Sequence, residues 1–387
     1  MKYFLFIYLL LLTHSIANAS TPPGCELLQD ALFDLSNAGG GTHTLSDDSV
    51  ICNAKQNNYM NTDSSHGLIV PEHVTLDLNG GTIQLSLTGG DDYGIRLASN
   101  AAIKNGTISL IESSNSGLQT IWHSAISVGA AYGHGGTSDN PSYFSNIGYW
   151  SISNININQP YDHAGIQIAS EAHHGLIENI RIYSSEEAVV GIGIDWGSVG
   201  DFSSEDNTMT NMREGWLAGD VYTTHPHHIT INNIVIENFT KQPKSENSNE
   251  DYAAIRVSAG HAISMSNITI NEAWRGIIFR GGDVGYEFAQ DSMRAHAHKA
   301  IRLENFTIYN AHDQGVIIDG LADNATVWRS NILNNIIAGV FINGVDFAPD
   351  NAAIINNDIY LNTPHIANQI KNINGTNITQ QGNQLNP

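Results

Sequence analysis

The chain has 387 residues, of which 38 are Asp or Glu and only 16 are Lys or Arg, so its formal net charge is −22. A chain of this length can bury a large core in one or two domains. Its charge excludes nucleic acid and anionic lipid surfaces as expected partners, because both repel an acidic protein. An anionic substrate would require the few arginines to gather at one site, or a bound cation to assist them.

Residues 1–19 have the pattern of a secretory signal peptide. Lys2 precedes an apolar run, and the small-residue sequence "ANA" ends at Ala19, which predicts cleavage there and a secreted or periplasmic product. In an oxidising compartment Cys25 and Cys52 are expected to form a disulfide. No later apolar run is long enough to span a membrane, so no membrane partner is expected.

One short pattern returns along the chain: an apolar residue, any residue, Asn, two further residues and an apolar residue, as in "IKNGTI" and "IENIRI". A period of about 25 residues with insertions in some turns accounts for the spacing and predicts stacked coils. Amides stacked in this way can hydrogen-bond along the axis. The pattern places in one column Asn105, Asn154, Asn179, Asn233, Asn267 and Asn305, with looser matches at Asn79, Asn331 and Asn357.

A second short strand precedes each asparagine motif, as in "YGIRLAS", "AGIQIAS" and "AAIRVSAG". Each has a small residue followed by apolar and variable residues in alternation, which is typical of a strand with one buried face. Short strands repeated in this way, without heptads or long amphipathic helices, predict an all-β solenoid.

About ten such coils, within residues 66–387, resemble the right-handed parallel β-helix of the pectate lyase-like superfamily. Residues 20–65 are then expected to be an N-terminal cap that protects the open end from edge pairing. The resemblance implies a polysaccharide partner more strongly than one reaction, because the superfamily includes polysaccharide lyases, uronan epimerases, glycoside hydrolases and non-enzymatic fibres.

Aligning the second strands places Arg256 on the outer face of the predicted solenoid. Charged and aromatic residues gather on the middle coils, where insertions at residues 129–148, 196–228 and 281–299 are expected to wall a groove suited to a linear polymer. The outward column is predicted to run Arg96, Ser127, Gln167, Gly193, Arg256, Ile278, Ile317 and Phe341, and the inward column Ile95, Ile126, Ile166, Ile192, Ile255, Ile277, Val316 and Val340.

β-Elimination on a uronate needs a clamp for the sugar carboxylate, a base for the proton α to it, and an acid for the leaving oxygen. Arg256 suits the clamp, because its planar fork matches a carboxylate. Tyr252 could protonate the leaving oxygen or act as the base, and His163 offers an imidazole for the proton transfer. Asp195, expected beside Arg256 in the groove, is the fourth catalytic candidate. The candidate substrate-binding residues are His123, His225, Trp274 and Arg280.

Other activities stay open on the same groove. A glycoside hydrolase needs two carboxylates about 5 to 9.5 Å apart, whereas Asp195 and Asp319 are predicted to lie three coils, or about 14 Å, apart. Hydrolysis would therefore require a loop acid. A uronan C5-epimerase needs the same clamp and proton chemistry as a lyase, and a glycan-binding β-helix without activity needs neither. The candidate loop acids are Asp201, Asp220 and Asp283.

Each candidate also has a purely structural interpretation. Arg256 could be a solvated strand residue paired with an Asp, His123 and His163 could cap strand ends, and Trp274 could pack under a loop.

A metal site is also considered and left unassigned. The sequence "HPHH" brings His225, His227 and His228 together, and His-x-His spacing lets a strand present two rings to one ion. No third ligand is evident from the spacing, and histidines at loop ends also bond to the backbone. The sequence "DWGSVGD" offers oxygen ligands for Ca²⁺, which is the one cofactor considered.

The sequence thus predicts a secreted polysaccharide lyase that cleaves a uronate-containing polymer of the alginate or glycosaminoglycan type by β-elimination. It is expected to act as a monomer, with the acidic polysaccharide as its partner.

Overall fold

The computed structural model describes a large part of the chain. The predicted signal peptide, residues 1–19, and the segment 20–23 that follows it lie outside the described residues. The described residues are 24–46, 49–53, 55–56, 65–86, 92–111, 124–129, 136–137, 140–141, 146–158, 164–169, 172–184, 188–194, 226–242, 252–257, 260–281, 299–320, 326–328, 331–335, 338–343, 353–355, 358–361, 370–373, 379–381 and 383–386.

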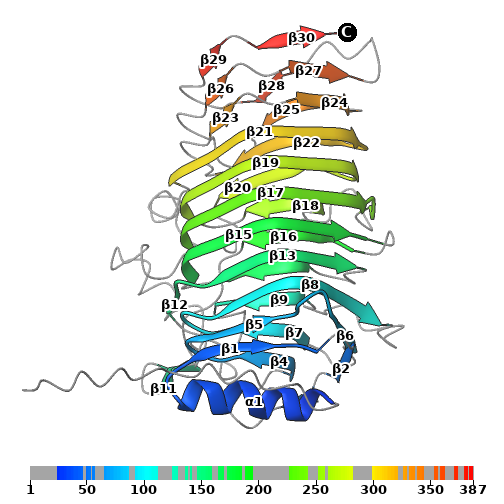
Figure 1. Cartoon of the computed structure of the whole chain (residues 1–387). Helices are drawn as coiled ribbons and strands as arrows, with labels where there is room; N and C mark the ends of the chain where they lie inside the picture. The colour runs from blue at the N-terminus through cyan, green and yellow to red at the C-terminus, as the bar shows by residue number, and fades with distance from the viewer. Residues whose placement is uncertain are drawn as a thin grey trace, which may run out of the picture.

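The strands wind into a solenoid in which each coil lies on the preceding one, from β1 near one end of the molecule to β30 at the other (Figure 1). Nearly all pairings between coils are parallel, and they build a long-strand sheet of 17 strands and a short-strand sheet of 11 strands. The predicted fold class, an all-β right-handed parallel β-helix, is confirmed. Among the described residues no helix is both long and apolar enough to cross a membrane.

The long-strand sheet comprises β1 (Gly41–Thr44), β2 (Val50–Asn53), β5 (Val74–Asp77), β6 (Thr82–Ser86), β8 (Ala102–Ile111), β12 (Ile147–Gly148), β13 (Ser151–Asn158), β15 (Ala172–Tyr183), β17 (His227–Phe239), β19 (His261–Ala273), β21 (Lys299–Ala311), β23 (Thr326–Trp328), β24 (Asn331–Asn335), β26 (Ala353–Ile355), β27 (Asp358–Leu361), β29 (Thr379–Gln381) and β30 (Gln384–Asn386). The short-strand sheet comprises β3 (Lys55–Gln56), β4 (Ser65–Val70), β7 (Asp92–Leu97), β9 (Ser124–Val128), β14 (Ala164–Ile168), β16 (Val190–Ile194), β18 (Ala253–Val257), β20 (Ile277–Gly281), β22 (Gln314–Gly320), β25 (Ala338–Asn343) and β28 (Ile370–Ile373). A separate antiparallel pair comprises β10 (Gly136–Thr137) and β11 (Asn140–Pro141).

Helix α1 (Cys25–Asn37) covers the N-terminal end of the solenoid (Figure 1). Gln29 fixes it there, because its amide donates to the carbonyl of Ile69 and accepts from the same residue's N–H, at 2.8 and 2.7 Å. The predicted disulfide between Cys25 and Cys52 is confirmed, with a Cα–Cα distance of 5.1 Å. Closing a loop of 27 residues stabilises the fold by about 3.5 kcal/mol on the chain-entropy estimate.

Parallel pairing begins before residue 66, where the sequence places the start of the β-helix domain. Strand β1 pairs with β5, and β2 pairs with β6, in the same long-strand sheet. The segment predicted as a cap therefore contributes strands to the solenoid as well as the helix that covers its end.

The interior is filled by aligned columns of aliphatic side chains. The predicted inward column is confirmed, since Ile126, Ile166, Ile192, Ile255 and Ile277 are paired in successive coils and are fully buried. Each such side chain contributes roughly 1.5 to 3 kcal/mol of burial free energy.

The small residue that opens each short strand has a steric cause. A Cβ atom on Gly191 would lie 2.6 Å from the carbonyl oxygen of Ala254 in the next coil, and one on Gly165 would lie 2.8 Å from that of Gly191. A side chain at Gly165 or Gly191 would therefore collide with the backbone of the next coil, whereas Ala125 and Ala254 hold the equivalent position in their own strands.

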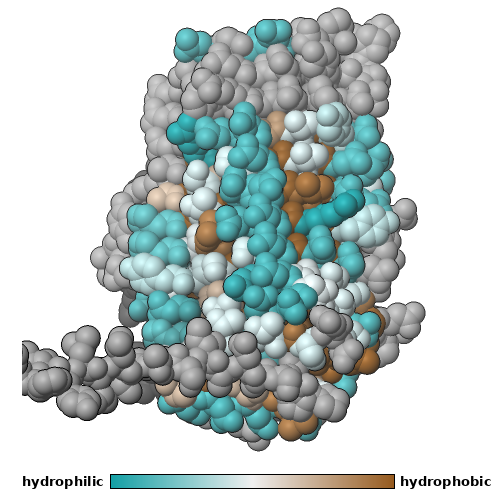
Figure 2. Space-filling model, in the orientation of Figure 1, coloured by the Kyte–Doolittle hydropathy of each residue, from teal (hydrophilic) through white to brown (hydrophobic). Residues whose placement is uncertain are grey.

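The asparagine column forms a hydrogen-bonded ladder along the axis. The side chain of Asn154 donates to Asn105, Asn179 to Asn154, and Asn233 to Asn179, at 2.7 to 3.0 Å. The ladder continues less regularly, because Asn267 donates to Asn232 and then accepts from Asn305. Figure 2 shows hydrophilic residues in a band along the axis on this side of the molecule.

Each ladder residue also bends its strand. The six asparagines from Asn105 to Asn305 have φ between 54° and 63°, in the left-handed region that Asn tolerates better than other non-glycine residues. The two properties of Asn, an amide that bonds in both directions and a tolerance of positive φ, explain why this column contains no other residue type in the described coils.

The looser matches do not belong to the ladder. Asn331 pairs with Thr307 and not with Asn305, so it lies two positions away from the column. Asn79 has a left-handed φ of 49°, but its amide donates to the carbonyl of Leu45, and Asn105 donates instead to Asp77. Asn357 lies outside the described residues.

We expect Asn179→Ala to lower the free energy of unfolding by about 2 kcal/mol. The variant loses two ladder bonds of roughly 0.5–1.5 kcal/mol each and places a Cβ-bearing residue without a compensating bond at φ 56°. The midpoint of urea unfolding measures the loss. Asn156→Ala, at an exposed strand position in the preceding coil, is the control and should change the midpoint little. Equal losses in the two variants would show that the ladder bonds contribute no more than an ordinary exposed asparagine.

Candidate functional site

The outer face of the short-strand sheet has the register predicted from the sequence. Ser127, Gln167, Gly193, Arg256 and Ile278 are paired in successive coils. The outward column is confirmed in this order, and its other members follow it at both ends.

Much of this face is buried. Ser127 is fully buried and Gln167 is 6% exposed, whereas Arg256 is the partly exposed member of the column among those whose burial is described. An apolar cluster of Ala253, Ile278 and Ile317 lies on the same outer side. Arg256 is thus the one described side chain of the column that combines a charge with access to solvent.

The arginine at the N-terminal end of the column has a structural environment. Arg96 is fully buried, donates from Nη2 to the carbonyl of Gly129 at 2.7 Å, and lies over the ring of Tyr93 with 4.8 Å to its centroid. Burial lowers the pKa of the Arg96 guanidinium to about 10. A fully buried guanidinium cannot reach a polymer, so Arg96 supports the fold.

Tyr252 and Trp274 belong to one packed cluster at the start of the strands. Tyr252 is 8% exposed and packs with Ala164, Val189 and Val190, while Trp274 is half-buried against them. The register that aligns Val189 with Tyr252 follows from the hydrogen bond between Ala253 and Val189. Tyr252 lies four residues before Arg256 on the approach to the same strand, but its catalytic role and the sugar-stacking role of Trp274 remain predictions.

A buried ion pair lies beside this cluster. Arg275 Nε donates to Asp313 Oδ2 at 2.7 Å, and the two side chains are 24% and 7% exposed. Burial raises the pKa of Asp313, although the hydrogen bond and charge of Arg275 oppose that shift. The backbone N–H of Asp313 donates to the carbonyl of Trp274 at 2.8 Å, so the pair also fixes the turn that carries the tryptophan.

The remaining candidates cannot be placed in a site. His123, His163, Asp195 and His225 lie outside the described residues. Arg280 is in β20, where its backbone pairs with Asp319 of the next coil, but its side chain also lies outside the described part of the chain. The insertions at 196–225 and 282–298 are likewise outside it, so the predicted groove stays a prediction.

A second arrangement, not predicted from the sequence, occurs at the corner where the long strands begin. Five histidines, His173, His174, His227, His228 and His261, stack there in two columns across three coils, and we call them the histidine corner. The ring centroids of His173 and His227 are 5.1 Å apart, those of His227 and His261 are 4.8 Å apart, and those of His174 and His228 are 4.9 Å apart.

Hydrogen bonds join the two columns within a coil. The Nδ1 atoms of His173 and His174 are 2.8 Å apart, as are those of His227 and His228. The His173 ring also approaches Gly148 so closely that a Cβ there would collide with it. Glycine at this position therefore leaves the space that the ring occupies.

Two rings of the histidine corner, His173 and His227, resist protonation. Burial, followed by the charges of neighbouring histidines, lowers the pKa of His227 to about 4. Burial and the neighbouring rings of His174 and His228 also lower the pKa of His173. Imidazoles packed at these distances cannot all carry charge, so the two rings at the centre stay neutral at pH 7.

The sequence contained a signal for this corner. His173, His227 and His261 each precede a ladder asparagine by six residues, and His174 and His228 occupy the next position. Aligning the coils on the asparagines would have placed all five in two adjacent columns. The cluster "HPHH" taken alone does not reveal the histidines at the same positions in the neighbouring coils.

Comparison with known proteins gives matches to structures only. No family model matches the chain, and no curated protein matches it either. Over 94% of the chain, a tailspike protein of Escherichia coli bacteriophage HK620, in complex with a pentasaccharide, is similar with a TM-score of 0.56 at 11% identity. The Dettilon tailspike protein is similar over 96% of the chain, with a TM-score of 0.52 at 12% identity.

The chain is a parallel β-helix. This β-helix spans 56% of the length of the HK620 tailspike and 60% of the length of the Dettilon tailspike. The A-module of the Azotobacter vinelandii mannuronan C-5 epimerase AlgE6 is also similar, over 94% of this chain and 95% of that one, with a TM-score of 0.49 at 13% identity. At such identities the likenesses to the two tailspikes show the fold and not the activity.

Proposed function

We propose that this β-helix is a polysaccharide lyase that cleaves a uronate-containing chain by β-elimination on the outer face of the short-strand sheet. The observation that carries the proposal is the position of Arg256: a partly exposed arginine in the outward column of the middle coils, in a chain with 16 basic residues against 38 acidic ones.

The electrostatics support an anionic ligand at this point. A carboxylate polymer is repelled by most of an acidic surface, so it can bind only where a cation is presented. The bidentate geometry of Arg fits a carboxylate, and the apolar residues beside it strengthen the interaction by excluding water. Ala253 and Ile278, in the apolar cluster on the same outer side, provide such surroundings.

The proposed reaction needs three functions. A base removes the proton at C5, α to the carboxylate; the C4–O bond breaks as the C4=C5 double bond forms; and the leaving oxygen receives a proton from an acid. Arg256 stabilises the negative charge that develops on the carboxylate. Tyr252 is proposed as the acid and His163 as the base, with Asp195 beside the clamp; His123, His225, Trp274 and Arg280 are proposed to hold flanking sugars.

The test is ultraviolet absorbance during incubation with a panel of uronate polysaccharides, because elimination creates a conjugated unsaturated uronate. Rising absorbance with alginate or a glycosaminoglycan is the expected result and also identifies the substrate. New reducing ends without absorbance would indicate a hydrolase, exchange of the C5 proton with solvent without cleavage would indicate an epimerase, and binding without either would indicate a glycan-binding protein. Each of these three outcomes would overturn the lyase proposal.

The same assay addresses calcium. Loss of activity in chelator, with recovery on adding Ca²⁺, would show that a cation assists Arg256 in neutralising the carboxylate.

A further inference from the structure

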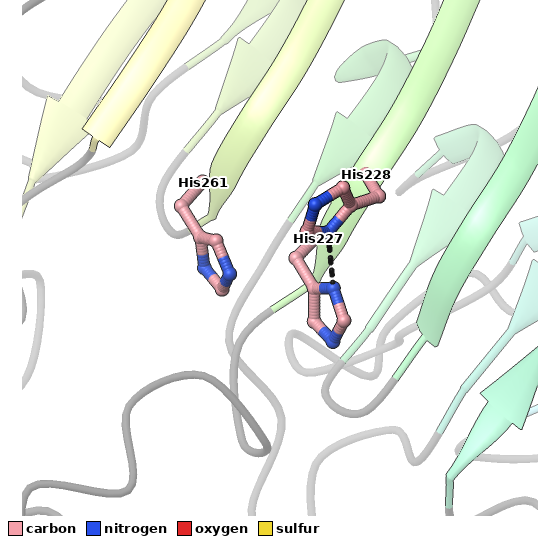
Figure 3. A group of neighbouring side chains, drawn as sticks. All are labelled: His227, His228 and His261. Carbon is pink, nitrogen blue, oxygen red and sulfur yellow. Dashed lines mark hydrogen bonds between the residues drawn. The ribbon is translucent and has the colours of Figure 1, made fainter.

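The histidine corner brings three ligand atoms together from two coils. His227 and His228 begin β17, and His261 begins β19, which pairs with it in parallel (Figure 3). One ring nitrogen from each of the three lies within 4.8 Å of the other two. The three residues also differ in burial: His261 is 6% exposed, His227 is half-buried and His228 is exposed, so the group opens toward solvent on one side.

The distance between the first two rings is close to that in an ion site, and the third ring, within 4.8 Å of them, must turn toward the ion. The Nδ1 atoms of His227 and His228 are 2.8 Å apart and joined by a hydrogen bond. Two imidazole nitrogens on one tetrahedral Zn²⁺, at 2.0–2.1 Å each, are about 3.3 Å apart. A small rotation of the two rings therefore replaces the hydrogen bond with an ion between them.

This replacement requires no net loss of a proton. In the hydrogen-bonded pair of neutral rings, one Nδ1 carries the proton and the other accepts. When both Nδ1 atoms bind an ion, the donor ring moves its proton to Nε2, where it can bond to water or to a neighbouring group.

The donor set determines the class of ion. Three imidazoles provide nitrogen ligands and no carboxylate, which suits Zn²⁺, Cu²⁺ or Ni²⁺ and not the oxygen-binding ions Ca²⁺ and Mg²⁺. Three protein ligands with one solvent-facing side leave a position for water or an exogenous ligand.

We propose that His227, His228 and His261 form a binding site for one divalent first-row transition ion, which links two successive coils of the β-helix. This site is separate from the proposed lyase chemistry, and its existence does not depend on that activity. The sequence analysis left the third ligand unassigned, and His261 of the next coil takes that role here.

The experiment is a calorimetric titration of the chelator-stripped mature protein with ZnCl₂, with a thermal unfolding scan at each end of the titration. We expect one equivalent of Zn²⁺ to bind and the unfolding midpoint to rise, because an ion that binds only the folded state stabilises it. CaCl₂ and MgCl₂ at the same concentration should give neither effect. No heat and no midpoint shift with ZnCl₂, or an equal response to CaCl₂, would overturn the proposal.

Variants identify the ligands. His228→Ala should weaken Zn²⁺ binding by about 100-fold, since loss of a second-shell partner alone costs 10–100-fold. Alanine is tolerated at this left-handed position, because Ala262 occupies the same column in the next coil with φ 52°. Unchanged binding in His228→Ala would place the ion elsewhere among the 17 histidines and refute the site.

Two further histidines are controls. His174 stacks on His228 but lies outside the proposed ligand set, and His312 lies away from the corner in contact with Glu272. His174→Ala and His312→Ala should each retain Zn²⁺ affinity within about threefold, well inside the effect of removing a ligand. A loss in either variant as large as in His228→Ala would contradict the assignment of the three ligands.

Discussion

Arg256→Ala is expected to lower kcat/KM on the cleaved polysaccharide by about 100- to 1,000-fold, which is the usual cost of removing one donor that stabilises developing negative charge. The thermal midpoint should stay nearly unchanged, because the side chain points outward from the short-strand sheet and its neighbours Ile255 and Val257 fill the core. Arg256→Lys should recover only part of the activity, since an ammonium cannot make the bidentate contact.

The matched control is Arg181→Ala. Arg181 is also an outward strand arginine, but it lies in the long-strand sheet, 61% exposed and paired with Glu237 at 2.7 Å. Its removal should change neither activity nor stability by a measurable amount, because exposed ion pairs contribute little. Full activity in Arg256→Ala would remove the clamp from the mechanism, and unfolding of that variant would assign Arg256 a structural role.

The repetitive part of the fold could be predicted from the sequence because each coil repeats the same local requirements. The column from Ile126 to Ile277 was set by alternation within each short strand, and the ladder from Asn105 to Asn305 by the fixed position of Asn three residues before an apolar residue. The alternation and the Asn position are each judged within one coil and its neighbour, so a misplaced coil does not shift the prediction for the coils that follow. The prediction failed at Asn331, which repeats the sequence pattern but pairs with Thr307, two positions away from the column.

Burial on the outer face was not predictable in the same way. Alternation places Arg96 and Arg256 in one column with the same outward direction, yet one is fully buried over Tyr93 and the other is partly exposed. The difference comes from local contacts such as those of Arg96 with Tyr93 and Gly129, which do not follow the repeat. Tyr252 shows the same limit, because its position was predicted and its packing against Val189 and Val190 was not.

The histidine corner shows a third limit. A single residue such as His261 does not by itself predict a cluster. Its neighbours in adjacent coils, such as His227, lie 34 residues or more away in the sequence. Only alignment of the coils on the asparagine ladder converts such residues into a cluster.

The ion pair of Arg275 and Asp313 should have the largest effect on stability among the described polar contacts near the site. We expect Arg275→Ala to lower the free energy of unfolding by about 3 kcal/mol at pH 7, because it leaves a nearly buried carboxylate without its partner. Arg275 is itself 24% exposed, which places the estimate at the lower end of the range for buried pairs. Urea unfolding monitored by tryptophan fluorescence measures the loss.

The pH dependence of Arg275→Ala gives a second, independent test. Burial already raises the pKa of Asp313, and Arg275 opposes that shift, so its removal raises the pKa further. Between the unfolded and folded pKa values the folded protein holds a proton that the unfolded chain releases, so stability falls as pH rises. The deficit of the variant should therefore shrink as the pH is lowered through the raised pKa of the folded state, and it is smallest below the unfolded pKa of about 3.9, where the carboxyl is neutral in both states.

Asp313→Asn in the Arg275→Ala background completes the cycle. Removing the charge leaves a neutral amide of nearly the same size, so the double variant should recover most of the 3 kcal/mol (about half to two-thirds) and lose the pH dependence. If the double variant is as unstable as Arg275→Ala at every pH, the cost comes from lost packing by the arginine stem and not from an unpaired carboxylate. Because the backbone of Asp313 bonds to the carbonyl of Trp274, that result would also mean that the turn beside the proposed site is positioned by packing alone.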